Sequence, residues 1–98
     1  MNTRHAQLVL AVVREGSFTA AAKSLFVTQP TLSQQIRQIE QQLGQPIFER
    51  STTPVSLTPA GQTLLTGAED LLRQADALAA AVHTAAEAAP EPPEPPEA

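Results

Sequence analysis

Apolar residues recur at helical spacing through the first half of the chain, and polar or glycine breaks divide them into segments. Between Arg4 and Arg14 the apolar side chains fall mostly on one broad face, and Gly16 then supplies a C-terminal stop. Ser17 can cap a second helix of about two turns, roughly Phe18 to Leu25. The pattern therefore predicts two short helices in succession.

A third helix is predicted after the brief apolar linker of residues 26–27. Thr28 can cap it, and Pro30 falls in its first turn, where a missing N–H costs nothing. The helix is expected to end at Gly44. Its buried stripe is predicted to be Leu32, Ile36, Ile39 and Leu43.

Two short runs with β-prone residues follow, at residues 47–50 and 55–57. Residues 51–54 between them have the composition of a turn, so the two runs predict a small two-stranded hairpin.

A long fourth helix is predicted from Thr58, which can cap it, and Pro59, its first residue, to about Ala89. Such a helix would extend for about 48 Å. Residues 90–98 consist mainly of proline and glutamate, which predicts an extended, disordered acidic tail. The pattern thus indicates a mainly α fold with the segments 1–58, 59–89 and 90–98.

Charge is distributed unevenly along the chain. The net charge is −4, but residues 1–66 hold five cationic and three anionic side chains, a balance of +2. Residues 67–98 hold one cation against seven acids, a balance of −6. Because sequence-independent affinity for nucleic acid comes from cations that neutralise phosphates, we expect weak, salt-sensitive binding by each monomer.

The chain of 98 residues has room for one small domain and contains no cysteine. Disulfides, thiolate metal sites and nucleophilic thiols are therefore excluded, and a reducing cytoplasm is the simplest setting. No apolar run is long enough for a signal or membrane helix, so no membrane partner is expected.

Two helices joined by a tight turn, the second with a polar outer face, are typical of a motif that fits the major groove of DNA. The identities of the residues are more specific evidence than this geometry. The sequence closely resembles the N-terminal domain of LysR-type transcriptional regulators over about Arg4 to Ala89. The residues that carry the resemblance are Gly16–Ala22, Thr28–Ser33, Ile36, Leu43–Gly44, Ile47–Arg50 and Leu57–Gly61. It implies a winged helix-turn-helix followed by a long linker and dimerisation helix.

The resemblance also implies that the third helix enters the major groove of double-stranded DNA. Expected base-facing residues are Gln29, Pro30, Thr31, Ser33 and Gln34, whose amide, hydroxyl and apolar groups suit base edges. Expected phosphate contacts are Arg37, Arg50, Thr28, Thr52 and Thr53. For each of these residues the alternative is a solvated polar surface, the interpretation we favour for Gln35, Gln38, Gln41 and Gln42.

The fourth helix carries a 4-3 repeat that predicts a dimer seam. The seam consists of Leu64, Ala68, Leu71, Ala75, Leu78 and Val82. The alternative is that this stripe packs within one chain, but a helix of about 48 Å extends beyond a body of some sixty residues. The resemblance implies antiparallel pairing of two such helices, and a twofold dimer matches an inverted-repeat site. A heterodimer or tetramer with a related regulator remains open.

No catalytic or metal-binding motif is present, so we expect no enzyme activity, no metal and no cofactor. His5 and His83 stand alone, and Glu49 with Arg50 is interpreted as a local ion pair. Regulators of this family carry an effector-binding domain after the linker helix, whereas here the helix leads into the Pro-Glu segment. We therefore expect no inducer site in this chain.

Two functions follow from the sequence. The first is a regulator that binds an inverted-repeat operator as a dimer. The second is an interaction protein that uses the fourth helix to pair with a full-length relative and modulates it. The intact Gln29–Ser33 segment favours the first, and the small basic charge favours the second.

Overall fold

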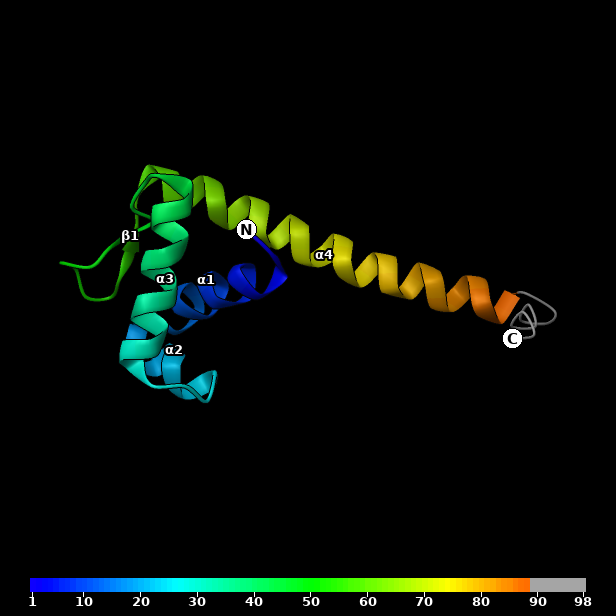
Figure 1. Ribbon diagram of the computed structural model, residues 1–98, viewed down its shortest axis with the longest axis horizontal. Coiled ribbons are helices and arrows are strands. Elements are labelled where there is room, and N and C mark those ends of the chain that lie inside the picture. The colour runs from blue at the N-terminus through cyan, green and yellow to red at the C-terminus, as the bar shows by residue number, and fades with distance from the viewer. Residues whose placement is uncertain (89–98) are drawn as a thin grey trace, which may run out of the picture.

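The computed structural model describes residues 1–88, in which one long helix projects from a body formed by the other elements (Figure 1). The elements in chain order are α1 (Thr3–Glu15), α2 (Phe18–Ser24), α3 (Gln29–Leu43), β1 (Phe48–Glu49), β2 (Ser56–Leu57) and α4 (Pro59–Ala88). All six predicted elements are present, with ends within a few residues of the expected ones. Ala89 and the predicted tail at 90–98 lie outside the described residues.

The caps predicted from the sequence form as hydrogen bonds. Ser17 Oγ accepts from Ala20 N–H at the start of α2, and Thr28 Oγ1 accepts from Thr31 N–H at the start of α3. Gly16 and Gly44 end α1 and α3 in the left-handed region, with φ of 75° and 72°. These caps satisfy helix-end groups that would otherwise lack partners, which fixes where each helix begins and ends.

The turn from α2 to α3 contains an unexpected backbone conformation. Phe26 has φ of 59°, and its side chain is 94% exposed. Its N–H donates to Lys23 O, and Val27 N–H donates to Ala22 O, as in a helix end that glycine usually occupies. The turn is therefore tight, and the phenylalanine points into solvent.

A single apolar core joins the helices of the body. Its largest fully buried side chains are Leu8, Val9, Val12, Leu32, Ile36, Ile39 and Ile47. Three of the four residues predicted for the stripe of α3 belong to this core. The fourth prediction is wrong, because Leu43 lies in the last turn of α3 and remains 43% exposed.

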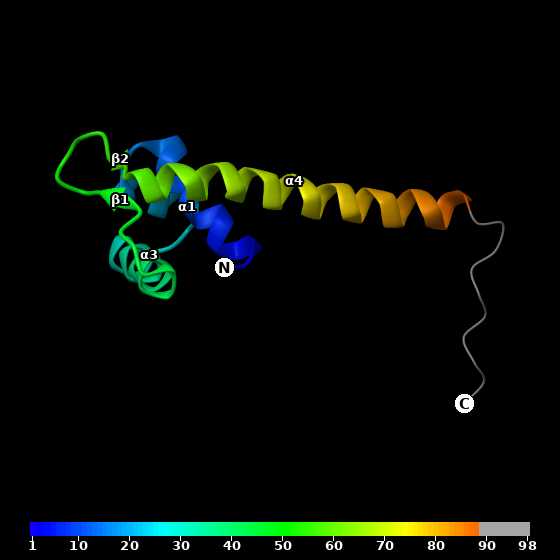
Figure 2. The ribbon, with the colours of Figure 1, turned by 90° about the horizontal axis from the view of Figure 1, so that it is seen from above.

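The two strands form the predicted hairpin, with Phe48 paired to Leu57 and Glu49 to Ser56 in antiparallel register. Phe48 packs edge-on against Phe18 of α2, which ties the hairpin to the helices. The loop between the strands extends away from the body, and Figure 2 shows it at the end opposite the projecting part of α4.

Thr58 caps α4 by accepting a hydrogen bond from Gly61 N–H while its hydroxyl donates to Pro46 O. The first half of α4 packs against α1, where Ala68 is buried. The second half extends beyond the body as an uninterrupted helix, as both ribbon views show (Figures 1 and 2).

Candidate nucleic-acid interface

The N-terminal half of α3 presents a polar surface to solvent. The apolar stripe of α3 faces the core, so the side chains on the opposite side point outward. The exposed residues among those predicted to contact DNA in this region are Thr28, Gln29, Pro30, Thr31, Gln34 and Arg37. The Thr28 hydroxyl also serves the cap, because it donates to Thr31 Oγ1.

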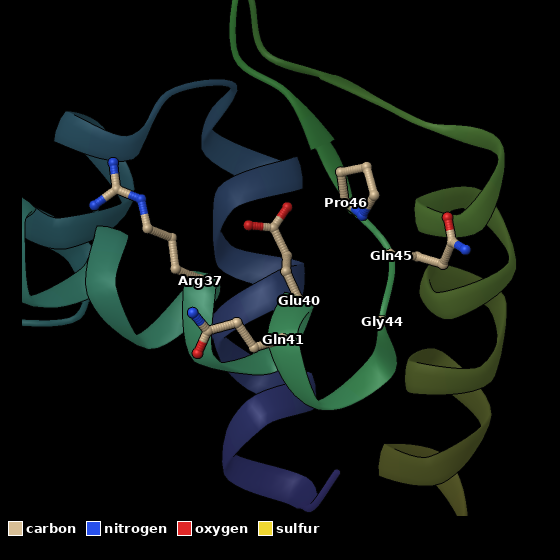
Figure 3. Close-up of a pocket in the computed structure, with 6 residues that line it drawn as sticks. All are labelled: Arg37, Glu40, Gln41, Gly44, Gln45 and Pro46. Carbon is tan, nitrogen blue, oxygen red and sulfur yellow. The ribbon is translucent and has the colours of Figure 1, made fainter.

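A row of exposed side chains runs along this outer side of α3. Pro30, Gln34, Arg37 and Gln41 are spaced 4, 3 and 4 residues apart, so they lie one above another on the helix. Figure 3 shows Arg37 and Gln41 beside a hollow of 360 Å³ that Gly44, Gln45 and Pro46 complete. The hollow is open to solvent rather than enclosed. Gln41, interpreted from the sequence as plain surface, thus continues the row that Gln34 and Arg37 begin.

Ser33, predicted as a base-contacting residue, lies outside this exposed surface. The residue is 5% exposed, and its hydroxyl accepts a 2.7 Å hydrogen bond from Arg50 Nη1. Ser33 precedes Gln34 of the exposed row by one residue, so its side chain is rotated from that row by about 100° around the axis of α3. The Ser33 hydroxyl is thus engaged with a side chain of its own protein.

Arg50, predicted as a phosphate contact, is held by three partners within its own chain. Its second nitrogen, Nη2, lies 3.2 Å from Glu40 Oε1, and its guanidinium carbon lies 4.5 Å from the centre of the Phe18 ring. The Arg50 side chain is 29% exposed and that of Glu40 only 15%. Together with Ser33, these residues bind the end of β1 to the middle of α3.

Glu40 completes this link on the other side. Its Oε2 accepts hydrogen bonds from Ile47 N–H at 2.7 Å and from Phe48 N–H at 3.4 Å. One carboxylate therefore joins α3 to the guanidinium and to the backbone that enters the hairpin. This role of Glu40 was not predicted from the sequence, in which the available signal was an acidic residue adjacent to Ile39 and ten positions before an arginine.

The predicted ion pair between Glu49 and Arg50 is also wrong. Glu49 instead accepts hydrogen bonds from the hydroxyl and the N–H of Ser51. These bonds favour the ionised carboxylate and lower the pKa of Glu49 below its ordinary value. Glu49, the last residue of β1, is exposed, whereas Arg50, which follows the strand, contacts Ser33 and Glu40 of α3.

Thr52 and Thr53, predicted as phosphate contacts, are both exposed in the loop of the hairpin. Thr52 Oγ1 donates to Glu49 O and lies 3.0 Å from Ser56 Oγ, so it also stabilises the loop. Both side chains are accessible to a ligand alongside α3.

The predicted dimer seam divides into two parts. Ala68 is 2% exposed and Leu64 packs on the core of its own chain, so this part of the predicted seam is engaged within one chain. These two residues lie where α4 crosses α1, which the sequence spacing could not distinguish from a seam. Leu71 and Ala75 are half-buried, whereas Leu78 and Val82 are 66% and 62% exposed.

Within residues 1–88, no group of three or more His, Asp or Glu side chains is arranged to hold a metal ion. The same residues include no helix long and apolar enough to cross a membrane.

The fold defines a class of protein: a winged helix-turn-helix, in which α2 and α3 form the helix-turn-helix and β1 and β2 the wing, followed by a long helix. Residues 3–62 match the family model described as "Bacterial regulatory helix-turn-helix protein, lysR family". The chain belongs to the LysR family, and it is a LysR-type DNA-binding domain of transcriptional regulators rather than an enzyme.

Relatives in sequence are regulators of transcription. The chain is 44% identical over 77 residues to the HTH-type transcriptional regulator BudR of Klebsiella aerogenes. This alignment covers 79% of this chain and 54% of BudR. It is 43% identical over 76 residues to BenM of Acinetobacter baylyi. This alignment covers 78% of this chain and 25% of BenM. The chain thus spans about half of the one relative and a quarter of the other.

Solved structures of the same family superpose closely. The BenM DNA-binding domain in complex with catB site 1 DNA has a TM-score of 0.84 at 39% identity and covers 89% of this chain and 94% of that one. The CbnR DNA-binding domain in complex with DNA has a TM-score of 0.81 at 35% identity and covers 88% of this chain and 99% of that one. The predicted fold, including the long helix after the wing, is confirmed.

Proposed function

We propose that this protein binds double-stranded DNA at an inverted-repeat operator as a dimer and regulates transcription there. The observation that carries the proposal is the exposed polar surface at the N-terminal half of α3, which the core residues Leu32, Ile36 and Ile39 hold in place from behind. A helix presented in this way fits the major groove. A regulator of chromosomal genes works in the cytoplasm, where we place this protein.

The exposed side chains suit the two kinds of contact that DNA offers. Gln29 and Gln34 can pair with an adenine edge, and the Pro30 ring and the Thr31 methyl can pack on a thymine methyl. Arg37 on α3 and the wing residues at 52 and 53 suit phosphates, which set the register of binding. The DNA complexes of the BenM and CbnR domains support this assignment, since both share the fold.

The segments at residues 1–58 and 59–89 have separate roles in this proposal. The first reads DNA, and the second joins two copies. The exposed Leu78 and Val82, with the half-buried Leu71 and Ala75, give α4 an apolar surface beyond its own body. A second copy covers this surface, and two reading helices related by a twofold axis match the two halves of an inverted repeat.

Substitution of one outer residue of α3 tests the reading surface. In Gln34→Glu a carboxylate replaces an amide beside base edges and phosphates, so affinity should fall about 10- to 100-fold. Binding is measured by fluorescence anisotropy on a duplex enriched by the wild-type protein from a random-sequence pool. Gln7→Glu on α1 is the matched control, because it makes the same change of charge at an exposed site beside Leu72.

Equal losses of DNA affinity in the Gln34 and Gln7 variants would mean that affinity depends only on net charge. That result would contradict the assignment of α3 as the element that reads DNA. A wild-type protein that enriches no sequence from the pool would overturn operator binding itself.

A second function uses the same surface of α4. The balance of only +2 over residues 1–66 favours a protein that pairs with a full-length LysR relative and modulates it. Mixing the two proteins and separating them by size distinguishes the cases. A mixed dimer that forms in preference to both homodimers would support this function, and separate homodimers would exclude it.

A further inference from the structure

The turn between α2 and α3 carries a large apolar side chain that the described residues do not cover. Phe26 is 94% exposed, whereas its two neighbours, Leu25 and Val27, pack against the core. Burial of a phenylalanine side chain is favourable, and a ring left in solvent does not gain that stabilisation. The ring of Phe26 therefore contributes little to the stability of this fold.

The backbone of the turn keeps the ring in this exposed position. Phe26 has φ of 59°, in the left-handed region, which glycine and asparagine adopt at a lower cost than phenylalanine. Its N–H donates to Lys23 O, and the N–H of the next residue donates to Ala22 O, so hydrogen bonds fix the turn on both sides of the ring. A bulky residue held in a conformation that suits glycine indicates a role for its side chain outside the fold.

Phe26 lies beside the proposed reading surface. The turn is at the end of α3 that lies away from the start of α4 (Figure 1). Three residues separate Phe26 from Gln29, so their two Cα atoms are at most about 11 Å apart. This distance corresponds to roughly three base steps along one DNA strand. A duplex that receives Gln29 in its major groove therefore presents base edges close to Phe26.

The surroundings of Phe26 suit DNA better than a protein partner. Thr28, Gln29 and Thr31, the polar residues that follow the turn, are exposed. The other large apolar residues that residues 1–88 expose lie at the N-terminus, at the far end of α3 and on α4: Met1, Leu43, Leu78 and Val82. A single apolar side chain is far smaller than the 800 Å² or so that each partner buries in a protein interface. It matches the size of one apolar group on DNA, the thymine methyl.

We propose that Phe26 contacts the C5 methyl group of a thymine in the major groove, next to the bases that α3 reads, and so adds a base preference to the operator. This inference rests on the proposed binding of DNA by α3 and adds a specificity-determining residue to it. The methyl group distinguishes thymine from the other bases in the major groove. Such a contact needs no charge, which suits a chain whose first 66 residues have a balance of only +2.

Removal of single methyl groups from DNA tests the contact. Deoxyuridine differs from thymidine only by the absent C5 methyl, so each thymine of the duplex enriched by the wild-type protein is replaced in turn. At the thymine that Phe26 contacts, the affinity of the wild-type protein should fall about 3- to 10-fold, and that of Phe26→Asn should not change. Thymines that contact other residues should give the same loss in both proteins, which provides a control within each duplex.

Three variants separate the side chain from the backbone. Asparagine adopts the left-handed conformation more readily, so Phe26→Asn should unfold at the same or a higher temperature while it binds DNA more weakly. Phe26→Tyr keeps the ring and should keep the loss on uracil. Leu43→Asn removes an exposed apolar side chain at the other end of α3 and should keep the wild-type pattern. None of these changes alters charge, so the salt dependence of binding should stay the same.

The outcomes separate this contact from DNA binding itself. A wild-type protein that binds a specific duplex but loses no affinity on any uracil substitution overturns the methyl contact, as does Phe26→Asn with the wild-type loss at every thymine. A uniform loss in Phe26→Asn on all duplexes would place the ring on the sugar-phosphate backbone and overturn the base preference. A lower melting temperature in Phe26→Asn would contradict a role outside the fold. A wild-type protein that enriches no sequence overturns operator binding.

Discussion

Arg50 contributes through the groups that hold it rather than through contact with solvent. Its two terminal nitrogens reach Ser33 on one side and Glu40 on the other, and its planar face covers the Phe18 ring. Charge-assisted hydrogen bonds of this kind are stronger than neutral ones, and the forked guanidinium makes two at once. The group therefore fixes the position of the wing relative to α3, on which any joint contact with one duplex depends.

Arg50→Lys separates this role from a phosphate contact. Lysine keeps the charge but lacks the fork, so the free energy of unfolding should fall by about 1–3 kcal/mol. Denaturant titration measures the loss, and Arg14→Lys at an exposed site of α1 should leave stability unchanged. If Arg50 acted on a phosphate instead, lysine would preserve both stability and DNA affinity.

At the scale of elements, two glycines of α4 are in opposite environments. A Cβ added at Gly61 would lie 2.1 Å from Ile47 O and 3.0 Å from Leu57 Cδ2, whereas at Gly67 it would meet nothing within 4 Å. Gly61 is thus required where α4 passes directly over the backbone of Ile47, the residue before β1. Gly67 has no such neighbour within its own chain.

Gly61→Ala should therefore destabilise the protein by at least about 2 kcal/mol, because the contact is with backbone, which cannot turn aside. Gly67→Ala should instead stabilise α4 by about 0.5–1 kcal/mol, since alanine loses less backbone entropy. Thermal unfolding of both variants checks the contrast. Two similar melting temperatures would mean that α4 does not approach Ile47 so closely.

The elements themselves follow closely from the sequence because their signals are local. Caps at Ser17, Thr28 and Thr58, and stops at Gly16 and Gly44, depend on neighbours within a few residues. Burial is not local in this sense. Spacing could not show that the body ends before Leu43, or that α1 covers Ala68.

In the candidate site, too, the local features could be predicted from the sequence and the contacts between distant residues could not. Exposure of Gln29, Pro30 and Gln34 follows from the helical period of α3, which the sequence shows. The inward turn of Ser33 depends on Arg50 and Glu40, which are distant in sequence, and no local pattern encodes that contact. Phe26 is a similar case. Its backbone is left-handed, a conformation that a glycine in the sequence would have indicated, but the residue at this position is a phenylalanine.

For the whole molecule, the distribution of charge limits binding. The reading half has a balance of only +2, and Arg50 is engaged internally, so few cations remain for phosphates. The proposed pairing of two copies would compensate for this weakness, because two joined heads bind one duplex with a high effective concentration.

One added cation in the wing should raise affinity measurably. Thr53→Lys adds a phosphate contact for each head, so the slope of log affinity against log salt should steepen by about 0.9 per contact, or about 1.8 for a dimer. Binding across a series of salt concentrations gives the slope. Gln7→Lys on α1 should change it much less, and identical slopes in the two variants would remove the wing from the interface.

The unbroken course of α4 has a consequence for how target sites are chosen. A helix of 30 residues without an internal break resists bending, unlike a glycine-rich tether. In the proposed dimer, the distance between the two reading heads would then be set by the protein and could not adjust to the DNA. Sites whose two halves hold the correct bases at another separation, or on another side of the duplex, would be rejected by geometry alone.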